Sequence, residues 1–305
     1  MNSSLVDAYL GLDIGGTGAK AGLFDRDGRL LGLGHAAYAP TVNAKGHIGL
    51  PIEAIYTAAR TSTRQALAAH PARVTALAVA SQGQTFVSLD EQDRPLHDAI
   101  LWYDSRATAQ SDRLKQAMAD QTPPVPRIEP IATAPKIMWL RDHHPDAMRR
   151  ARRYLLLPDY FAYRLTGQAV TDPNTASSTG LMAESALDYH EPTLRAAGIA
   201  RDQLARILPC GKPIATVTAA AAAEWGLAAA TLLVTGTNDQ YAGALGAGNC
   251  RPGILTETSG TCLALVTLTE RLPSPLPAGL LGGPFPIPPY QFALAYSKTA
   301  GVVLD

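Results

Sequence analysis

The chain of 305 residues has only three cysteines, Cys210, Cys250 and Cys262, and they lie far apart. They are too few and too scattered for a disulfide framework or a paired-cysteine metal site, which favours a reducing compartment. A surplus of either charge is also missing, because 26 Lys and Arg residues balance 26 Asp and Glu residues. Nucleic-acid binding needs a basic surplus or a basic stripe, so this balance argues against a nucleic-acid partner.

The sequence also lacks the patterns that send a chain to or through a membrane. Its first residues do not combine a basic start with the long apolar run of a secretory signal. The most apolar long stretch, residues 214–236, contains Glu224 and Gly226. A helix that spans a bilayer needs roughly 20 apolar residues with few or no charges. We therefore expect a soluble, cytoplasmic protein without a membrane partner.

The residue pattern itself is that of an α/β protein. Tight turns separate three extended segments at the N-terminus, which predicts an antiparallel three-stranded meander over 8–14, 19–24 and 29–35. Apolar residues at helical spacing predict a helix over 51–70. Continuous apolar runs are typical of strands covered on both faces of a mixed sheet. Further strands are expected at 74–80, 86–89 and 231–235, and further helices at 105–120, 134–143, 159–165 and 216–225.

A second unit is expected from about residue 249 onward. Strands at 254–258 and 262–267 flank the turn Ser259-Gly260-Thr261, which repeats the strand–turn–strand pattern of the N-terminus. Residues 272–289 are rich in proline and glycine and are expected to be irregular, before a strand at 292–296 and the start of a helix at 298–305. We expect a first domain over 1–248 and an incomplete second domain over 249–305, too short to close its own core.

The clearest local motif is LDIGGTGAK at residues 12–20. A carboxylate near the end of an apolar strand precedes two glycines and a threonine, and exposed N–H groups in such a turn can cradle phosphate oxygens. Asp13 could hold Mg²⁺ through water, since Mg²⁺ prefers one or two carboxylates together with substrate phosphates. A plain hairpin turn explains this motif equally well. A dinucleotide fold is excluded because the turn at 25–28 leaves no room for the helix that its fingerprint requires.

A second motif, VTGTNDQYAGALGAG, covers residues 234–248. Asp239 follows a buried strand, and a carboxylate at the carboxyl end of a strand in an open α/β sheet points into the ligand crevice. The alternative is that Asp239 caps the helix that follows.

Eight segments, in order along essentially the whole chain, resemble the FGGY family of carbohydrate kinases. The match is strong because of the order, since each segment alone is only moderately specific. The segments are LDIGGTGAK (12–20), SQGQTFVSLD (81–90), ILWYDSRA (100–107), PKIMWLRDHHPD (135–146), LLLPDYFAYRLTG (155–167), TDPNTASSTG (171–180), GTNDQYAGALGAG (236–248) and ETSGTCLAL (257–265).

The resemblance implies an actin-like, ribonuclease-H-like fold, shared with sugar kinases and heat-shock ATPases, with a mixed five-stranded sheet flanked by helices. It implies phosphorylation of a sugar hydroxyl, with ATP and Mg²⁺ as cofactors and Asp239 as the general base. Asp13 would lie near the metal, and Lys20 is either a phosphate ligand or an exposed strand residue. The phosphate-binding residues implied are Gly15, Gly16 and Thr17 from the first lobe and Gly260 and Thr261 from the second.

The resemblance is closest to xylulokinases and implies that D-xylulose is converted to xylulose 5-phosphate. Gly83 and Gln84 stand where xylulokinases usually have a Met-His pair, so ribulose, L-xylulose or another polyol is an open alternative. A truncated lobe that binds sugar without turnover is a further alternative, and a homodimer is possible. For Arg106, holding a loop in place is as well supported as sugar contact. The remaining residues expected around the sugar are Trp102, Asp104 and Asn238.

Overall fold

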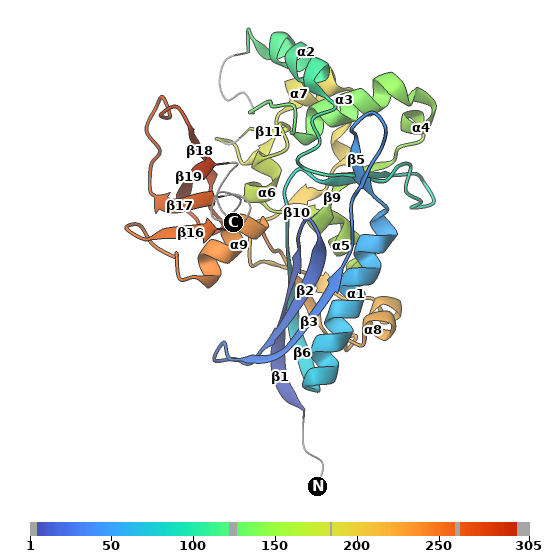
Figure 1. Cartoon of the computed structure of the whole chain (residues 1–305), viewed down its shortest axis with the longest axis vertical. Coiled ribbons are helices and arrows are strands. Elements are labelled where there is room, and N and C mark those ends of the chain that lie inside the picture. The colour runs from blue at the N-terminus through green and yellow to red at the C-terminus, as the bar shows by residue number, and fades with distance from the viewer. Residues whose placement is uncertain (1–4, 122–126, 184, 260–262, 298–305) are drawn as a thin grey trace.

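The computed structural model describes residues 5–121, 127–183, 185–259 and 263–297. It has a central mixed sheet with a long helix against one face, a layer of helices at one end of that sheet, and a separate antiparallel sheet at its side (Figure 1). Residues before helix α9 (Asp239–Gly246) form the central sheet, and residues after it form the side sheet.

The central sheet has six strands in the order β14-β15-β6-β1-β2-β3. The predicted N-terminal meander is confirmed, because β1 pairs antiparallel with β2 and β2 pairs antiparallel with β3. Strand β6 lies parallel to β1, and β15 lies parallel to β6. These strands are β1 (Val6–Ile14), β2 (Gly18–Phe24), β3 (Leu30–Ala37), β6 (Ala72–Ser81), β14 (Pro213–Thr216) and β15 (Leu232–Val234).

The predicted count of five strands is wrong, since β14 adds a sixth strand at the edge. It pairs antiparallel with β15 through an irregular register. The four residues of β14 lie directly before an alanine-rich stretch, so the residue pattern does not distinguish this strand from the helix that follows. That helix, α8, covers Ala219–Trp225 and is shorter at its start than predicted.

Helix α1 (Ile52–Ala69) packs against the meander because β3 presents glycines to it. A Cβ atom at Gly34 would overlap the Ser62 carbonyl of α1, and one at Gly32 would overlap the Ala66 carbonyl. Missing side chains on β3 therefore let the helix approach the sheet closely. Ile55 and Ala59 of α1 are fully buried in the resulting core.

A second, five-stranded sheet and the helices at 108–118, 133–143, 145–149 and 191–197 form the layer at the end of the central sheet (Figure 1), whereas the helix at 157–166 packs against the central sheet and belongs to its core. Phe86, Leu114 and Ile137 belong to the separate core of this layer. The predicted helices at 105–120, 134–143 and 159–165 are confirmed as α2, α3 and α5. The elements are β4 (Thr41–Val42), β5 (Ile48–Leu50), β7 (Phe86–Leu89), β8 (Ala99–Ile100), α2 (Thr108–Met118), α3 (Thr133–His143), α4 (Pro145–Arg149), β9 (Arg153–Leu156), α5 (Leu157–Thr166), β10 (Val170–Thr171), α6 (Pro173–Ser177), β11 (Met182–Ala183), β12 (Asp188–Tyr189), α7 (Glu191–Ala197), η1 (Arg201–Gln203) and β13 (Arg206–Ile207).

The side sheet is antiparallel and has the strand order β16-β17-β19-β18. Helix α9 packs on it through Tyr241, whose ring centroid lies 4.3 Å from that of Phe292. The prediction that 272–289 is irregular is wrong in part, because β18 forms within it and pairs with β19. The helix predicted over 298–305 lies outside the described residues. The strands are β16 (Leu255–Ser259), β17 (Leu263–Thr269), β18 (Leu280–Pro284) and β19 (Gln291–Ser297).

Within the described part of the chain, no helix combines the length and the apolar character needed to cross a membrane.

Candidate active site

The site lies where three neighbouring parallel strands of the central sheet end. Strands β15, β6 and β1 are adjacent and parallel, so their carboxyl ends share one edge of the sheet. Asp13 lies at the end of β1, Ser81 ends β6, and the loop after β15 leads to Asp239. The backbone N–H of Ser81 donates to the Thr237 carbonyl, at 3.4 Å, which ties that loop to β6. The fold thus brings together the two carboxylates that the sequence places 226 positions apart.

Asp239 is the first residue of α9, and its Oδ1 accepts a hydrogen bond from the Gln240 N–H at 2.7 Å. Burial raises the pKa of Asp239 to about 6, and the nearby charge of Asp13 also raises it. The capping residue of the helix is Asn238, whose side chain accepts from the same Gln240 N–H at 3.1 Å. The capping role that the sequence left open for Asp239 is therefore filled by its neighbour.

Asp13 lies across from Lys20 in the β1–β2 register. Burial raises the pKa of Asp13, and the charge of Lys20 acts in the opposite direction. The hydroxyl of Tyr38 donates to the Gly15 carbonyl at 2.6 Å, beside these groups. Burial and then the charges of Asp13 and Asp239 raise the pKa of Tyr38, so both carboxylates lie close enough to this hydroxyl to act on it electrostatically.

The glycine turn between β1 and β2 offers its N–H groups unequally. The Gly15 N–H donates to the Gly18 carbonyl at 3.0 Å and so closes the turn. In the described residues, no protein acceptor pairs with the N–H groups of Gly16 or Thr17. Thr17 is exposed, as is Lys20 on the adjoining strand. Free N–H groups in such a turn can bind an anion. The N–H groups of Gly16 and Thr17 can therefore bind a phosphate, while the Gly15 N–H holds the turn closed.

Two buried oxygen atoms at this edge have no hydrogen-bond partner among the described residues: Asp13 Oδ1 and Gln82 Oε1. The amide nitrogen of Gln82 donates to the Gly15 carbonyl at 3.0 Å, which directs its oxygen elsewhere. Carboxylate, carbonyl and water oxygens are the ligands that Mg²⁺ prefers, so this donor set fits a hydrated Mg²⁺. No group of three or more His, Cys, Asp or Glu side chains is placed to hold a metal ion in the described chain.

Asp172 is a buried residue at this edge that the sequence reasoning missed. Its carboxylate caps α6 by accepting from the Asn174 and Thr175 N–H groups, and it accepts from the Thr237 hydroxyl at 3.0 Å. Burial raises the pKa of Asp172 to about 6 despite these hydrogen bonds. Asp172 therefore anchors the loop that carries Asp239.

The expected sugar-contacting segments meet under helix α3. Gln84 has a φ of 57°, and its carbonyl accepts from the Thr133 hydroxyl of α3 at 3.3 Å. The Trp102 N–H donates to the Thr85 hydroxyl at 2.9 Å. The amine of Lys136, also on α3, donates to the carbonyls of Leu101 and Trp102 at 2.7 and 3.0 Å. One helix thus fixes both segments, and a lysine in the otherwise apolar run of α3 was the available sequence signal.

Asp104 and Arg106 form a buried ion pair that holds a loop. The Asp104 carboxylate accepts from the Arg106 side chain at 2.7 Å and from the Ile48 N–H. Burial alone would raise the pKa of Asp104, but the hydrogen bonds from Arg106 and Ile48 outweigh it and lower that pKa. The guanidinium of Arg106 lies 4.9 Å from the ring centroid of Trp139. These contacts favour the loop-holding alternative for Arg106.

The stability contribution of Lys136 should depend on pH. Burial lowers the pKa of this fully buried amine to about 7. Between pH 7 and the ordinary lysine pKa, the unfolded chain binds a proton that the folded chain does not. Over this range, the free energy of unfolding of the unmodified chain should increase with pH, relative to that of Lys136→Met, by up to about 1.4 kcal/mol per pH unit.

Urea denaturation of both proteins from pH 6 to pH 9.5 measures this difference. The exposed Lys115 of α2 provides the matched control, and Lys115→Met should track the unmodified chain at every pH. Parallel pH curves for Lys136→Met and the unmodified chain would contradict the expectation.

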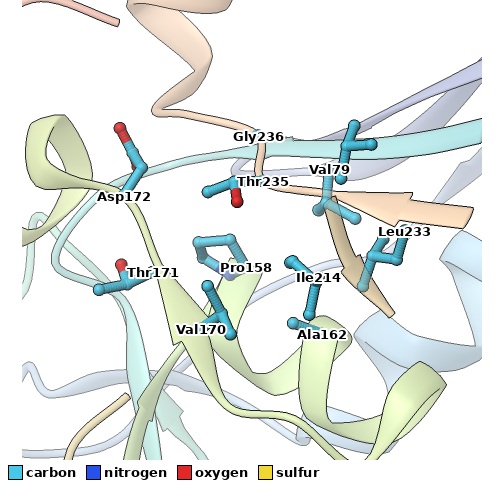
Figure 2. Close-up of a pocket in the computed structure, with 11 residues that line it drawn as sticks. Val79, Pro158, Ala162, Val170, Thr171, Asp172, Ile214, Leu233, Thr235 and Gly236 are labelled. Atoms are coloured by element: carbon cyan, nitrogen blue, oxygen red, sulfur yellow. The ribbon is translucent and has the colours of Figure 1, made fainter. Parts of the chain in front are cut away.

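Two cavities near the site contain none of the predicted site residues. Figure 2 shows the smaller one, beneath the end of β15 and lined by Val79, Asp172 and Gly236 among others. Its volume is about 10 Å³, room for about one water molecule. The larger cleft, about 710 Å³, lies along α6 and β18 and is lined mainly by leucine and proline side chains. Neither is lined by Asp13 or Asp239. Gly260 and Thr261 lie outside the described residues.

Comparison with known proteins gives a consistent result. The model of the FGGY family of carbohydrate kinases, N-terminal domain, matches residues 8–246. A gluconokinase from Bacillus subtilis (strain 168) is 28% identical over 273 residues, 86% of this chain and 52% of that protein. A xylulose kinase from Streptomyces rubiginosus is 35% identical over 222 residues, 71% of this chain and 44% of that protein. The chain thus spans about half the length of the curated relatives it matches.

The structural comparison agrees with the sequence comparison. The crystal structure of a xyloylose kinase from Brucella ovis has a TM-score of 0.91 at 26% sequence identity, covering 97% of this chain and 62% of that chain. The likeness confirms the actin-like α/β fold that the sequence predicts.

Proposed function

The chain belongs to the FGGY family of carbohydrate kinases, and from that premise we propose that it transfers the γ-phosphate of ATP to a sugar hydroxyl. The observation that carries the proposal is the meeting of Asp13 and Asp239 at the common carboxyl edge of β1, β6 and β15, with the pKa of Asp239 raised to about 6. A base with a pKa near the working pH is deprotonated at pH 7 and still basic enough to take a proton in the transition state.

In the proposed mechanism, Asp239 accepts the proton of the sugar hydroxyl while that oxygen attacks the γ-phosphorus, the bond from the γ-phosphorus to the bridging oxygen of ATP breaks, and ADP leaves. Positioning and charge neutralisation supply most of the acceleration in phosphoryl transfer. The Gly16 and Thr17 N–H groups and the Lys20 amine would bind phosphate oxygens. Gly260 and Thr261 remain predicted phosphate contacts from the second lobe.

Asp13, with Gln82 beside it, would hold hydrated Mg²⁺. When bound, Mg²⁺ neutralises charge on the transferring phosphoryl group. Asp172 keeps the loop of Asp239 in place through the hydroxyl of Thr237.

We propose D-xylulose as the substrate and xylulose 5-phosphate as the product. The name of the Streptomyces relative and of the similar Brucella structure support this choice. The name of the gluconokinase relative supports a sugar acid as the alternative substrate. Gln84 differs from the histidine usual in xylulokinases, and an amide can donate to and accept from hydroxyl groups without taking up charge. A cytoplasmic location and a homodimer also stay predictions.

Sugar binding should be visible as thermal stabilisation of the 305-residue chain. A ligand that binds only the folded state at 100 times its Kd adds about 2.7 kcal/mol to the free energy of unfolding. We expect D-xylulose to raise the melting temperature more than D-ribulose, D-gluconate or glycerol does. A parallel assay of ATP consumption with each sugar distinguishes a kinase from a lobe that only binds sugar. If none of the four raises the melting temperature, the proposed function is wrong.

A further inference from the structure

A groove on the helical layer carries a surplus of positive charge. It has a volume of about 640 Å³ and lies among helices α2, α3, α4 and α7, which Figure 1 shows together at the top of the molecule. Its lining contains Arg113, Arg141 and Arg149 against a single carboxylate, that of Asp142. The whole chain has no net charge, so this local surplus marks a surface suited to an anion. None of the candidate active-site residues lines the groove.

Arg141 presents a guanidinium that no carboxylate neutralises within the described chain. One of its five N–H donors bonds to the Ala197 carbonyl at the end of α7. Gly198, with a φ of 66°, makes room for this arrangement, because a Cβ atom there would lie 1.5 Å from Arg141 Nη1. The end of α7 thus fixes the guanidinium in place and leaves its other N–H donors without a partner in the part of the chain that the structure describes.

Tyr154 supplies a second free donor to the same groove. This residue is only 5% exposed, yet its hydroxyl has no hydrogen-bond partner among the described residues. Burial raises the pKa of Tyr154, while the positive charge of Arg141 acts to lower it. The phenol therefore keeps its proton at neutral pH and lies near the guanidinium. Leaving a buried donor unpaired is costly, so this hydroxyl indicates that the groove holds a hydrogen-bond acceptor.

The other two arginines can turn toward a bound anion at little cost. Arg113 pairs with Asp142 at 2.9 Å, and Arg149 pairs with Asp146. The Arg113 and Arg149 side chains are 55% and 71% exposed, respectively, and exposed ion pairs contribute little to stability. A ligand in the groove can therefore compete with these carboxylates for both guanidinium groups.

We propose that this groove is a second anion site, which binds the phosphoryl group of a small phosphorylated molecule. A guanidinium fork matches two phosphate oxygens, and a protonated phenol can donate to a third. The groove volume is typical of small-molecule sites, so an organic part can be accommodated together with the phosphoryl group. The site does not depend on the proposed kinase reaction, since the two share no residue.

Calorimetric titration of the 305-residue chain with D-ribose 5-phosphate tests the proposal, and inorganic phosphate provides the comparison for the phosphoryl group alone. We expect the ester to bind more tightly than inorganic phosphate, and both to bind more weakly at higher salt, because ions screen exposed charges. Arg141→Gln should weaken binding of the ester about tenfold or more, and Tyr154→Phe about threefold or more, since each removes a hydrogen bond to a charged oxygen.

Arg152→Gln is the matched control. Arg152 is another exposed arginine in the same basic stretch, pairs with Asp202 at 2.9 Å and does not line the groove, so its loss should leave ester affinity unchanged. Because Arg141 also supports the end of α7, melting curves accompany every titration. Tyr154→Phe keeps the packing of the ring and decides the outcome if Arg141→Gln does not fold. Lys20→Gln reports on the glycine turn of the active site, the other place where a phosphate is expected to bind.

The pattern of affinities across these variants decides the outcome. Unchanged ester affinity in the folded groove variants, an equal loss in Arg152→Gln, or no saturable binding at all would overturn the proposal. A loss in Lys20→Gln alone would assign the anion to the active site and would overturn it as well. Inorganic phosphate that binds as tightly as the ester would contradict the assignment to a phosphorylated molecule. All of these outcomes leave the proposed function intact, because sugar-induced stabilisation and ATP consumption are measured separately.

Discussion

Asp239→Asn is expected to lower the rate of phosphoryl transfer between about 10²- and 10⁴-fold, the contribution typical of a positioned general base. Asparagine has nearly the same shape but cannot accept the proton at pH 7. Sugar affinity should change little, since the amide still offers an oxygen to the hydroxyl. The measurement is ATP consumption with D-xylulose, compared with the dissociation constant of the sugar.

The same substitution should make the fold more stable. The folded-state pKa of Asp239 is raised from 3.8 to about 6, so ionising this residue costs the folded chain more than the unfolded chain. The stability that the protonated Asp239 carboxyl contributes is fully present below pH 3.8, and this contribution is lost as the pH rises through 6. At pH 7 the variant should therefore be more stable by up to about 3 kcal/mol.

The pH dependence of both effects tests whether they share one cause. The stability gain of Asp239→Asn should be small near pH 4 and complete by pH 7. The turnover of the unmodified chain should rise over the same interval, as Asp239 loses its proton. Asp27→Asn, which replaces an exposed carboxylate in the β2–β3 turn, is the matched control. Retained activity with a lower melting temperature would show that Asp239 is structural.

The sequence predicts the strands that carry the catalytic candidates because their signals are local. The N-terminal meander follows from alternating residues and a strong turn at 25–28, and Asp13 lies at the end of a strand while Asp239 follows the end of another by a short loop. Strands β14 and β18 were missed because their pairing partners, and not their own residues, make them strands. Short segments without alternation carry too little local preference to identify.

The supporting residues were missed for a related reason. Asp172 and Lys136 act through contacts with the segments at 235–239 and 101–102, which are distant in sequence. Their residue types are equally common on surfaces, so only the fold distinguishes them. Arg106 illustrates the converse case, because its neighbour Asp104 two residues earlier made the ion pair a plausible alternative from the sequence alone.

Gly236→Ala is expected to disrupt the site and the central sheet together. Gly236 lies between β15 and Asp239, beside Val79 of β6 (Figure 2). A Cβ atom there would overlap the Val79 carbonyl, a backbone group that cannot turn away as a side chain can. Forcing extra atoms into a packed core costs roughly 1–3 kcal/mol, and a rigid backbone neighbour favours the upper end.

The functional loss should exceed the loss in stability, because the strain is relieved by moving the loop that holds Asp239. The Ser81–Thr237 hydrogen bond, already 3.4 Å long, is the contact expected to break first. Sugar-induced thermal stabilisation should therefore vanish even where the variant still melts cooperatively. Gly243→Ala is the matched control, since a Cβ in this exposed turn of α9 meets no atom within 4 Å and should add about 0.5–1 kcal/mol. Normal stability and normal sugar binding in Gly236→Ala would mean that β15 and β6 do not hold the base in the way this packing requires.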